Sequence, residues 1–90
     1  MNVKEAVTAA KSYILEIFAG EQVTNLGLEE VEFDEHRNVW LVTIGFSRPW
    51  DAPPNLLGMV ASNPKRTYKT VQISGESGAH FSIKNREVAT

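Results

Sequence analysis

Residues 68–86 read YKTVQISGESGAHFSIKNR, and this stretch decides the fold. Apolar residues alternate with polar ones on both sides of a Ser-Gly-Glu-Ser-Gly turn, at Val71, Ile73, Phe81 and Ile83. Because successive side chains of a strand point to opposite faces of the sheet, these four are expected to share one face. Glycine supplies the positive-φ backbone that a tight turn between antiparallel strands often needs. The stretch therefore predicts a β-hairpin.

The first twenty residues predict a helix. Apolar residues recur at the helical spacing, at Val3, Val7, Ala10, Ile14 and Ile17. Asn2 can accept a hydrogen bond from a first-turn amide while Glu5 reaches back to the Asn2 amide, as in a capping box. Gly20 can take the left-handed conformation that often ends a helix. We expect a helix over residues 3–19.

Two strands are expected between the helix and the hairpin. In residues 22–33 the helical period is lost, and Val31 and Phe33 alternate with acidic residues. Residues 39–46 are apolar on both faces, which is typical of a central strand. Alternation places one set of side chains under the helix, at Trp40, Val42, Ile44 and Phe46. It places a second set on the opposite face, at Val39, Leu41, Thr43, Tyr68, Thr70, Gln72, His80, Ser82 and Lys84.

The predicted fold class is α+β, as one domain over residues 1–90 with an N-terminal helix packed on a four-stranded antiparallel sheet. Residues 47–66 form a long loop between the second and third strands, and loops beyond about 12–15 residues are often functional. This loop contains four prolines together with large apolar residues, at Trp50, Leu56, Leu57, Met59 and Val60. Two interpretations stay open, since such residues either complete the core or form a surface that binds a partner.

Composition and charge restrict the function classes. The chain has 90 residues, of which 42% are hydrophobic, and no apolar run is long enough to span a bilayer. The net charge of −2 argues against a nucleic-acid partner. Residues 1–45 hold eight acids and three bases, whereas residues 46–90 hold three acids and six bases. Either acidic and basic strands meet in one solvated sheet, or the protein presents a polarised surface to a partner.

Neither a targeting signal nor a disulfide framework is expected. The N-terminal segment lacks the basic head and continuous apolar run of a secretory signal, and the chain contains no cysteine. A cytoplasmic location is the default expectation, and a mature secreted chain is the alternative.

Candidate catalytic and metal-binding groups are few. His36 lies beside acidic residues in an expected turn, where polar residues occur for structural reasons, and the spacing is not that of a metal site. Ser74, Ser77 and His80 include the residue types of a hydrolase triad, but a tight hairpin supplies neither a pocket nor oxyanion donors. No glycine-rich phosphate motif is present. We expect no enzyme activity, no metal and no cofactor.

The C-terminal hairpin resembles the end of the PepSY domain, an aromatic-led strand followed by a turn glycine and a last strand. Tyr68, Val71, Ile73 and Gly78 match that pattern, and the preceding helix and two strands match the order of the family. Ser74 stands where the family usually has an aspartate. The resemblance implies a cystatin-like arrangement, with a helix packed across a curved antiparallel sheet. It also implies a non-catalytic module that inhibits or restrains a partner protein.

The leading hypothesis is therefore a non-catalytic protein-interaction module, inhibitory or regulatory towards a protein partner. Its expected contact residues are Trp50, Leu56, Leu57, Met59, Val39 and Leu41. A second hypothesis is a small-ligand-binding protein with a pocket between the helix, the sheet and the 47–66 loop. A third is a homodimer that uses the exposed sheet face or an edge strand. No membrane partner is expected.

Overall fold

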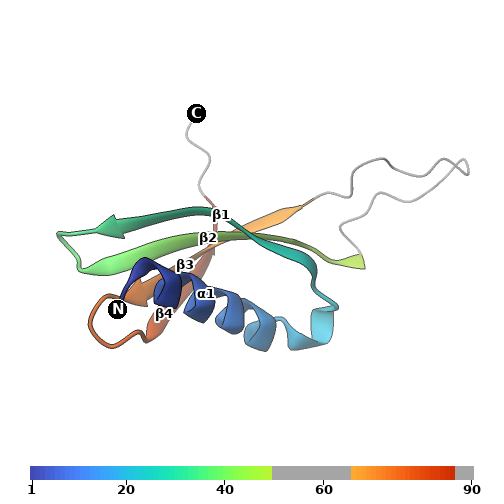
Figure 1. Ribbon diagram of the computed structural model, residues 1–90. Helices are drawn as coiled ribbons and strands as arrows, with labels where there is room; N and C mark the ends of the chain where they lie inside the picture. The colour runs from blue at the N-terminus through green and yellow to red at the C-terminus, as the bar shows by residue number, and fades with distance from the viewer. Residues whose placement is uncertain (50–65, 87–90) are drawn as a thin grey trace, which may run out of the picture.

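The computed structural model describes residues 1–49 and 66–86, with residues 80 and 81 described by their backbone alone. The elements are α1 (Val3–Ile17), a 3₁₀ turn η1 (Ala19–Glu21), β1 (Thr24–Asp34), β2 (Val39–Ser47), β3 (Thr67–Ser74) and β4 (His80–Asn85). The four strands form one antiparallel sheet in the order β1-β2-β3-β4, and α1 lies across one face of it (Figure 1). The predicted fold class is confirmed.

The start of α1 follows the sequence prediction, but its end does not. The amide of Glu5 donates to Asn2 Oδ1, and the amide of Asn2 donates to Glu5 Oε1, each at 2.8 Å, which completes the capping box. The helix ends at Ile17, and the chain continues into the η1 turn. Because this turn extends the helical path, the left-handed residue is Gln22, with φ of 51°, and the expectation that Gly20 takes this role was wrong. No helix among the described residues is long and apolar enough to span a bilayer.

The core lies between α1 and the face of the sheet that it covers. Ala6, Ala10 and Ile14 on α1 are fully buried, and so are five strand residues that face them: Val42, Ile44, Phe46, Val71 and Ile73. Burial of a valine, isoleucine or phenylalanine side chain stabilises a protein by roughly 1.5–3 kcal/mol relative to exposure. This row of apolar side chains therefore holds the helix against the sheet.

Three register shifts interrupt the regular pairing, and the first lies between Thr24 and Gly27 in β1. Leu28 pairs with Ile44 and Glu30 pairs with Thr43, so Glu29 is an extra residue in β1, as in a β-bulge. In β4 a third shift places His80 opposite Ile73. The expected position of the Phe81 side chain lies outside the described part of the structure.

Ion pairs join the acidic first half of the chain to the basic second half. Arg48 contacts Glu21 at 2.8 Å, Arg66 contacts Glu29 at 3.2 Å and Arg86 contacts Glu30 at 3.3 Å. In each pair the base comes from residues 46–90 and the acid from residues 1–45. The charge asymmetry is therefore used, in part, to connect segments that are distant in the sequence.

Candidate binding site on the open face of the sheet

The face of the sheet opposite α1 carries a hollow with a volume of about 930 Å³. We call the surface formed by its lining residues the open face. These residues are Glu30, Glu32, Arg37, Leu41, Thr43, Tyr68, Thr70, Gln72, Lys84, Asn85 and Arg86. Within the described residues, no helix covers this surface (Figure 1).

Strand pairing arranges the centre of the open face in two rows. One row runs from Glu32 on β1 through Leu41 to Gln72 on β3. The next row runs from Glu30 on β1 through Thr43 and Thr70 to Lys84 on β4. Members of both rows share a face because they directly oppose one another across neighbouring strands. The carboxylates therefore lie on the β1 side of the open face, and the lysine lies on the β4 side.

The floor of the hollow is polar around one apolar side chain. Thr43 is only 5% exposed, and its hydroxyl is 3.0 Å from the Thr70 hydroxyl. One of these two hydroxyls donates to the other, so the accepting threonine keeps a hydrogen for an outside acceptor. Leu41 is half-buried beside this pair. The floor can thus donate a hydrogen bond and also offers apolar contact.

Arg86 closes one end of the hollow. It follows β4, and its backbone amide donates to the carbonyl oxygen of Tyr68 at 3.2 Å. Its guanidinium lies 5.9 Å from the centre of the Tyr68 ring and reaches Glu30 on β1 at 3.3 Å. The two edge strands of the sheet are therefore linked by an ion pair that passes over the open face.

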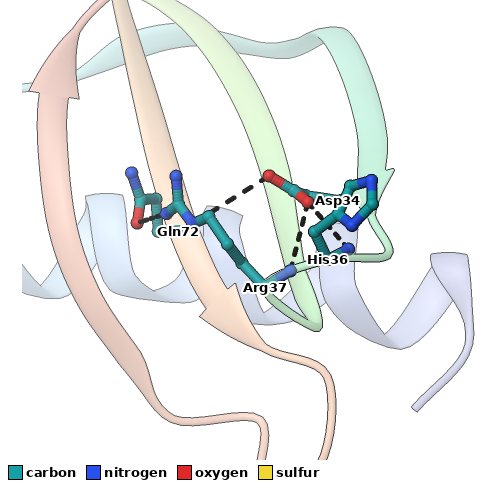
Figure 2. Close-up of polar contacts among 4 residues, drawn as sticks. All are labelled: Asp34, His36, Arg37 and Gln72. Carbon is teal, nitrogen blue, oxygen red and sulfur yellow. Dashed lines mark hydrogen bonds and ion pairs between the residues drawn. The ribbon is translucent and has the colours of Figure 1, made fainter.

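Arg37 bounds the opposite end of the hollow. Figure 2 shows its polar contacts with Asp34 and Gln72. Arg37 lies in the turn between β1 and β2, where Asp34 Oδ1 accepts hydrogen bonds from the amides of His36 and Arg37 at 3.1 and 3.2 Å. The Arg37 guanidinium donates to Gln72 Oε1 at 2.6 Å and lies 3.9 Å from the Asp34 carboxylate. Because the carbonyl oxygen of Gln72 is engaged, its amide nitrogen remains a donor toward the hollow.

Two charged side chains of the open face form no ion pair within the part of the chain that the structure describes. Glu30, Arg37 and Arg86 each take part in an ion pair. Within residues 1–49 and 66–86, Glu32 and Lys84 make none, and both are exposed. With respect to the described residues, the hollow therefore has an unpaired negative charge on its β1 side and an unpaired positive charge on its β4 side.

The predicted contact residues fall into three groups. Leu41 lies at the centre of the open face and lines the hollow. Val39 is on the same strand but is only 5% exposed, so it offers little contact surface. Trp50, Leu56, Leu57 and Met59 lie outside the described residues.

Most of the open face could be anticipated from strand alternation, which placed Thr43, Tyr68, Thr70, Gln72 and Lys84 opposite the helix. The sequence interpretation missed Glu30, Glu32, Arg37 and Arg86 as parts of one site. Continuing the alternation backwards through the turn at residues 35–38 would have found the two glutamates. The reach of the two arginines over the sheet carries no comparable periodic signal.

A second hollow, of about 400 Å³, lies where the start of α1 meets the edge of the sheet. Its lining is mainly apolar and comes from Val3, Lys4, Val7, Thr8 and Leu28. It therefore involves both the helix and the sheet. The part of that predicted pocket formed by the 47–66 loop lies mostly outside the described residues.

The residues considered for catalysis have structural tasks in the turns. Ser74 Oγ accepts hydrogen bonds from the amides of Glu76 and Ser77, each at 3.3 Å, and Ser77 Oγ accepts one from the amide of Ala79 at the same distance. Asp34, next to His36, is engaged by the β1–β2 turn. Among the described residues, no cluster of three or more histidine, aspartate or glutamate side chains is arranged to hold a metal ion.

No family model, no curated protein and no solved structure matches this chain. The resemblance to the PepSY domain therefore remains a prediction from the sequence. The candidate site rests on the geometry of the open face.

Proposed function

We propose that the protein is a non-catalytic interaction module, regulatory or inhibitory towards a partner protein, and that it binds this partner through the open face. The observation that supports this function best is the hollow of about 930 Å³ on the sheet face opposite α1. Its lining combines the apolar Leu41, the aromatic Tyr68 and charges of both signs. Such a mixture of apolar contact and oriented polar groups is common at protein interfaces.

Within the described residues, two charged side chains of the open face take no part in the ion pairs of the fold. The apolar core on the opposite side of the sheet holds α1 in place, whereas Glu32 and Lys84 make no ion pair with the described residues. Charged side chains at a protein interface commonly select and orient the partner. We keep Trp50, Leu56, Leu57 and Met59 as additional predicted contacts.

Affinity capture from an extract of the native host tests this proposal. The bait with Leu41→Arg should lose the partner, because the larger charged side chain occupies the floor of the hollow. Leu15→Arg is the matched control, since Leu15 is 50% exposed on α1 and does not line the open face. A Trp50→Ala/Leu57→Ala bait tests the predicted contribution of the loop.

Circular dichroism and urea unfolding should first establish that all baits fold equally well. A partner that binds the wild type and the Leu15→Arg bait but not the Leu41→Arg bait supports the proposal. Partners that bind all four baits equally would contradict both the open face and the loop as contact surfaces.

The alternative is a small-ligand-binding protein, and the hollow between α1 and β1 favours it because its lining is mainly apolar. A thermal-shift screen against a metabolite collection tests this function. A ligand that raises the melting temperature of the wild type but not of Leu28→Arg would support it. A complete absence of such shifts, together with Leu41-dependent capture of a protein, would exclude it in favour of the interaction module.

A further inference from the structure

The charges of the open face restrict what can bind there. Five charged side chains line the hollow, and three of them already have ionic partners. Glu32 and Lys84 remain without one among the described residues. An occupant that covers them removes water from both, and burying a charge without a counter-charge is unfavourable. A well-fitted occupant must therefore bring a positive group to Glu32 and a negative group to Lys84.

The separation of the two charges sets the size of the occupant. Glu32 is on β1 and Lys84 is on β4, at opposite edges of the four-stranded sheet. Three interstrand spacings of about 4.8 Å put the two strands about 14 Å apart, and the neighbouring rows of Glu32 and Lys84 increase the distance between their backbone positions to about 16 Å. In an extended polypeptide, side chains four residues apart share one face and are also about 14 Å apart.

The floor suits a polypeptide backbone. The amide nitrogen of Gln72 and one hydroxyl of the Thr43–Thr70 pair are donors that can reach carbonyl oxygens of a bound segment. Leu41 lies on β2, directly opposite Glu32, and offers apolar contact to a side chain between the charged ones. Positions two residues apart in an extended segment point the same way, so one segment can present all three groups.

We propose that the open face binds an extended segment of the partner protein with a basic and an acidic side chain four residues apart. The basic residue contacts Glu32, the acidic residue contacts Lys84, and the segment crosses the strands over Leu41. This inference rests on the proposed interaction function and adds the chemistry of the partner segment. A second copy of this chain and a polyanion such as RNA are the competing occupants.

Synthetic peptides of seven residues test the charge pattern. The mixed peptide carries lysine at its second position, leucine at its fourth and glutamate at its sixth, with serine elsewhere and blocked termini. Two controls carry lysine at both charged positions or glutamate at both. Titration of the isotope-labelled full-length protein, followed by amide chemical shifts, gives both the dissociation constant and the surface that is contacted. The mixed peptide should shift amides of the open face and bind about fivefold more tightly than either control.

Charge reversal in the protein provides the sharper test. Glu32→Lys should change the preference to the peptide with two glutamates, and Lys84→Glu should change it to the peptide with two lysines. The double variant Glu32→Lys/Lys84→Glu should prefer the mixed peptide again, because the segment can bind in the opposite direction. Recovery in the double variant distinguishes charge recognition from structural damage.

Several results would overturn this inference. A lack of shifts at the open face up to several millimolar peptide would do so, as would preferences that charge reversal leaves unchanged. Tightest binding of the glutamate peptide to the wild type would indicate a polyanionic occupant. Concentration-dependent shifts at the open face without peptide would indicate a second copy. If capture of a partner still depends on Leu41 in any of these cases, the interaction function stands and only the charge pattern fails.

Discussion

Replacement of Arg48 by alanine should destabilise the protein by about 2 kcal/mol. Arg48 follows β2, and its side chain is only 16% exposed. The guanidinium lies 5.7 Å from the centre of the Phe18 ring and 5.5 Å from the centre of the Phe46 ring. The centres of these two rings are 5.4 Å apart. The guanidinium also reaches the Glu21 carboxylate at 2.8 Å. One side chain thus connects the end of β2 to the segment that follows α1.

The magnitude follows from these contacts. A cation over an aromatic ring contributes about 0.5–1 kcal/mol at an exposed site, so two rings give about 1–2 kcal/mol. Glu21 is 36% exposed, and ion pairs at such positions contribute about 0.2–1 kcal/mol. For a chain of 90 residues, 2 kcal/mol corresponds to a fall in melting temperature of about 10 °C.

Urea unfolding of four proteins separates the ion pair from the other contacts of Arg48: the wild type, Arg48→Ala, Glu21→Gln and the double variant. Glu21→Gln removes only the ion pair and should cost about 0.5 kcal/mol. The interaction energy from the double-mutant cycle should be similarly small. A cost of Arg48→Ala below about 0.5 kcal/mol, or a cycle in which the ion pair accounts for the whole effect, would refute the role of the two rings.

The remaining predictions concern the core, the helix start and the β3–β4 turn. Val42→Ala should lower the free energy of unfolding, measured in urea, by about 2–4 kcal/mol because Val42 is fully buried. Leu15→Ala, on the exposed side of α1, should lower it by less than about 0.5 kcal/mol. Equal losses of stability would contradict the assigned core. Asn2→Ala should cost about 1 kcal/mol and lower the helical signal in circular dichroism, and an unchanged unfolding midpoint would mean that the cap contributes nothing. Gly78→Ala should lower the free energy of unfolding by about 1–2 kcal/mol because φ of Gly78 is 73°. Gly20→Ala should leave it unchanged, since a Cβ at Gly20 meets no atom within 4 Å. An unchanged stability of Gly78→Ala would show that the turn relaxes freely.

The sequence predicted the helix and the sheet because their signals are local and periodic. The polar and apolar residues of β3 alternate, so Val71 and Ile73 could be assigned to the core before any contact was known, and both are fully buried. The capping box was also readable, since Asn2 and Glu5 are three residues apart and their chemistry depends on little else. The alternation of a strand is repeated along the whole element, so a single irregular residue does not obscure it.

Features that depend on one backbone angle or on one long side chain could not be predicted in this way. Gly20 was expected to end α1, but the η1 turn postpones the left-handed residue to Gln22, where glycine would have been the more usual choice. The bulge at Glu29 changes the register of β1 by one residue. The contact of Arg86 with Glu30 joins residues 56 positions apart. None of these features repeats along the chain.

The two faces of the sheet are therefore under different constraints. On the side of α1, apolar residues fill the space under the helix, and replacing one of them with a smaller residue leaves a cavity. On the open face, Glu32 and Lys84 have no ionic partner among the described residues, so reversing either charge removes no ion pair that stabilises the fold. Surface substitutions of this kind usually change the free energy of unfolding by less than about 0.5 kcal/mol. Variants at these two positions can therefore change binding while the stability of the fold stays the same. A test of recognition by the open face requires that effects on binding be distinguished from effects on folding.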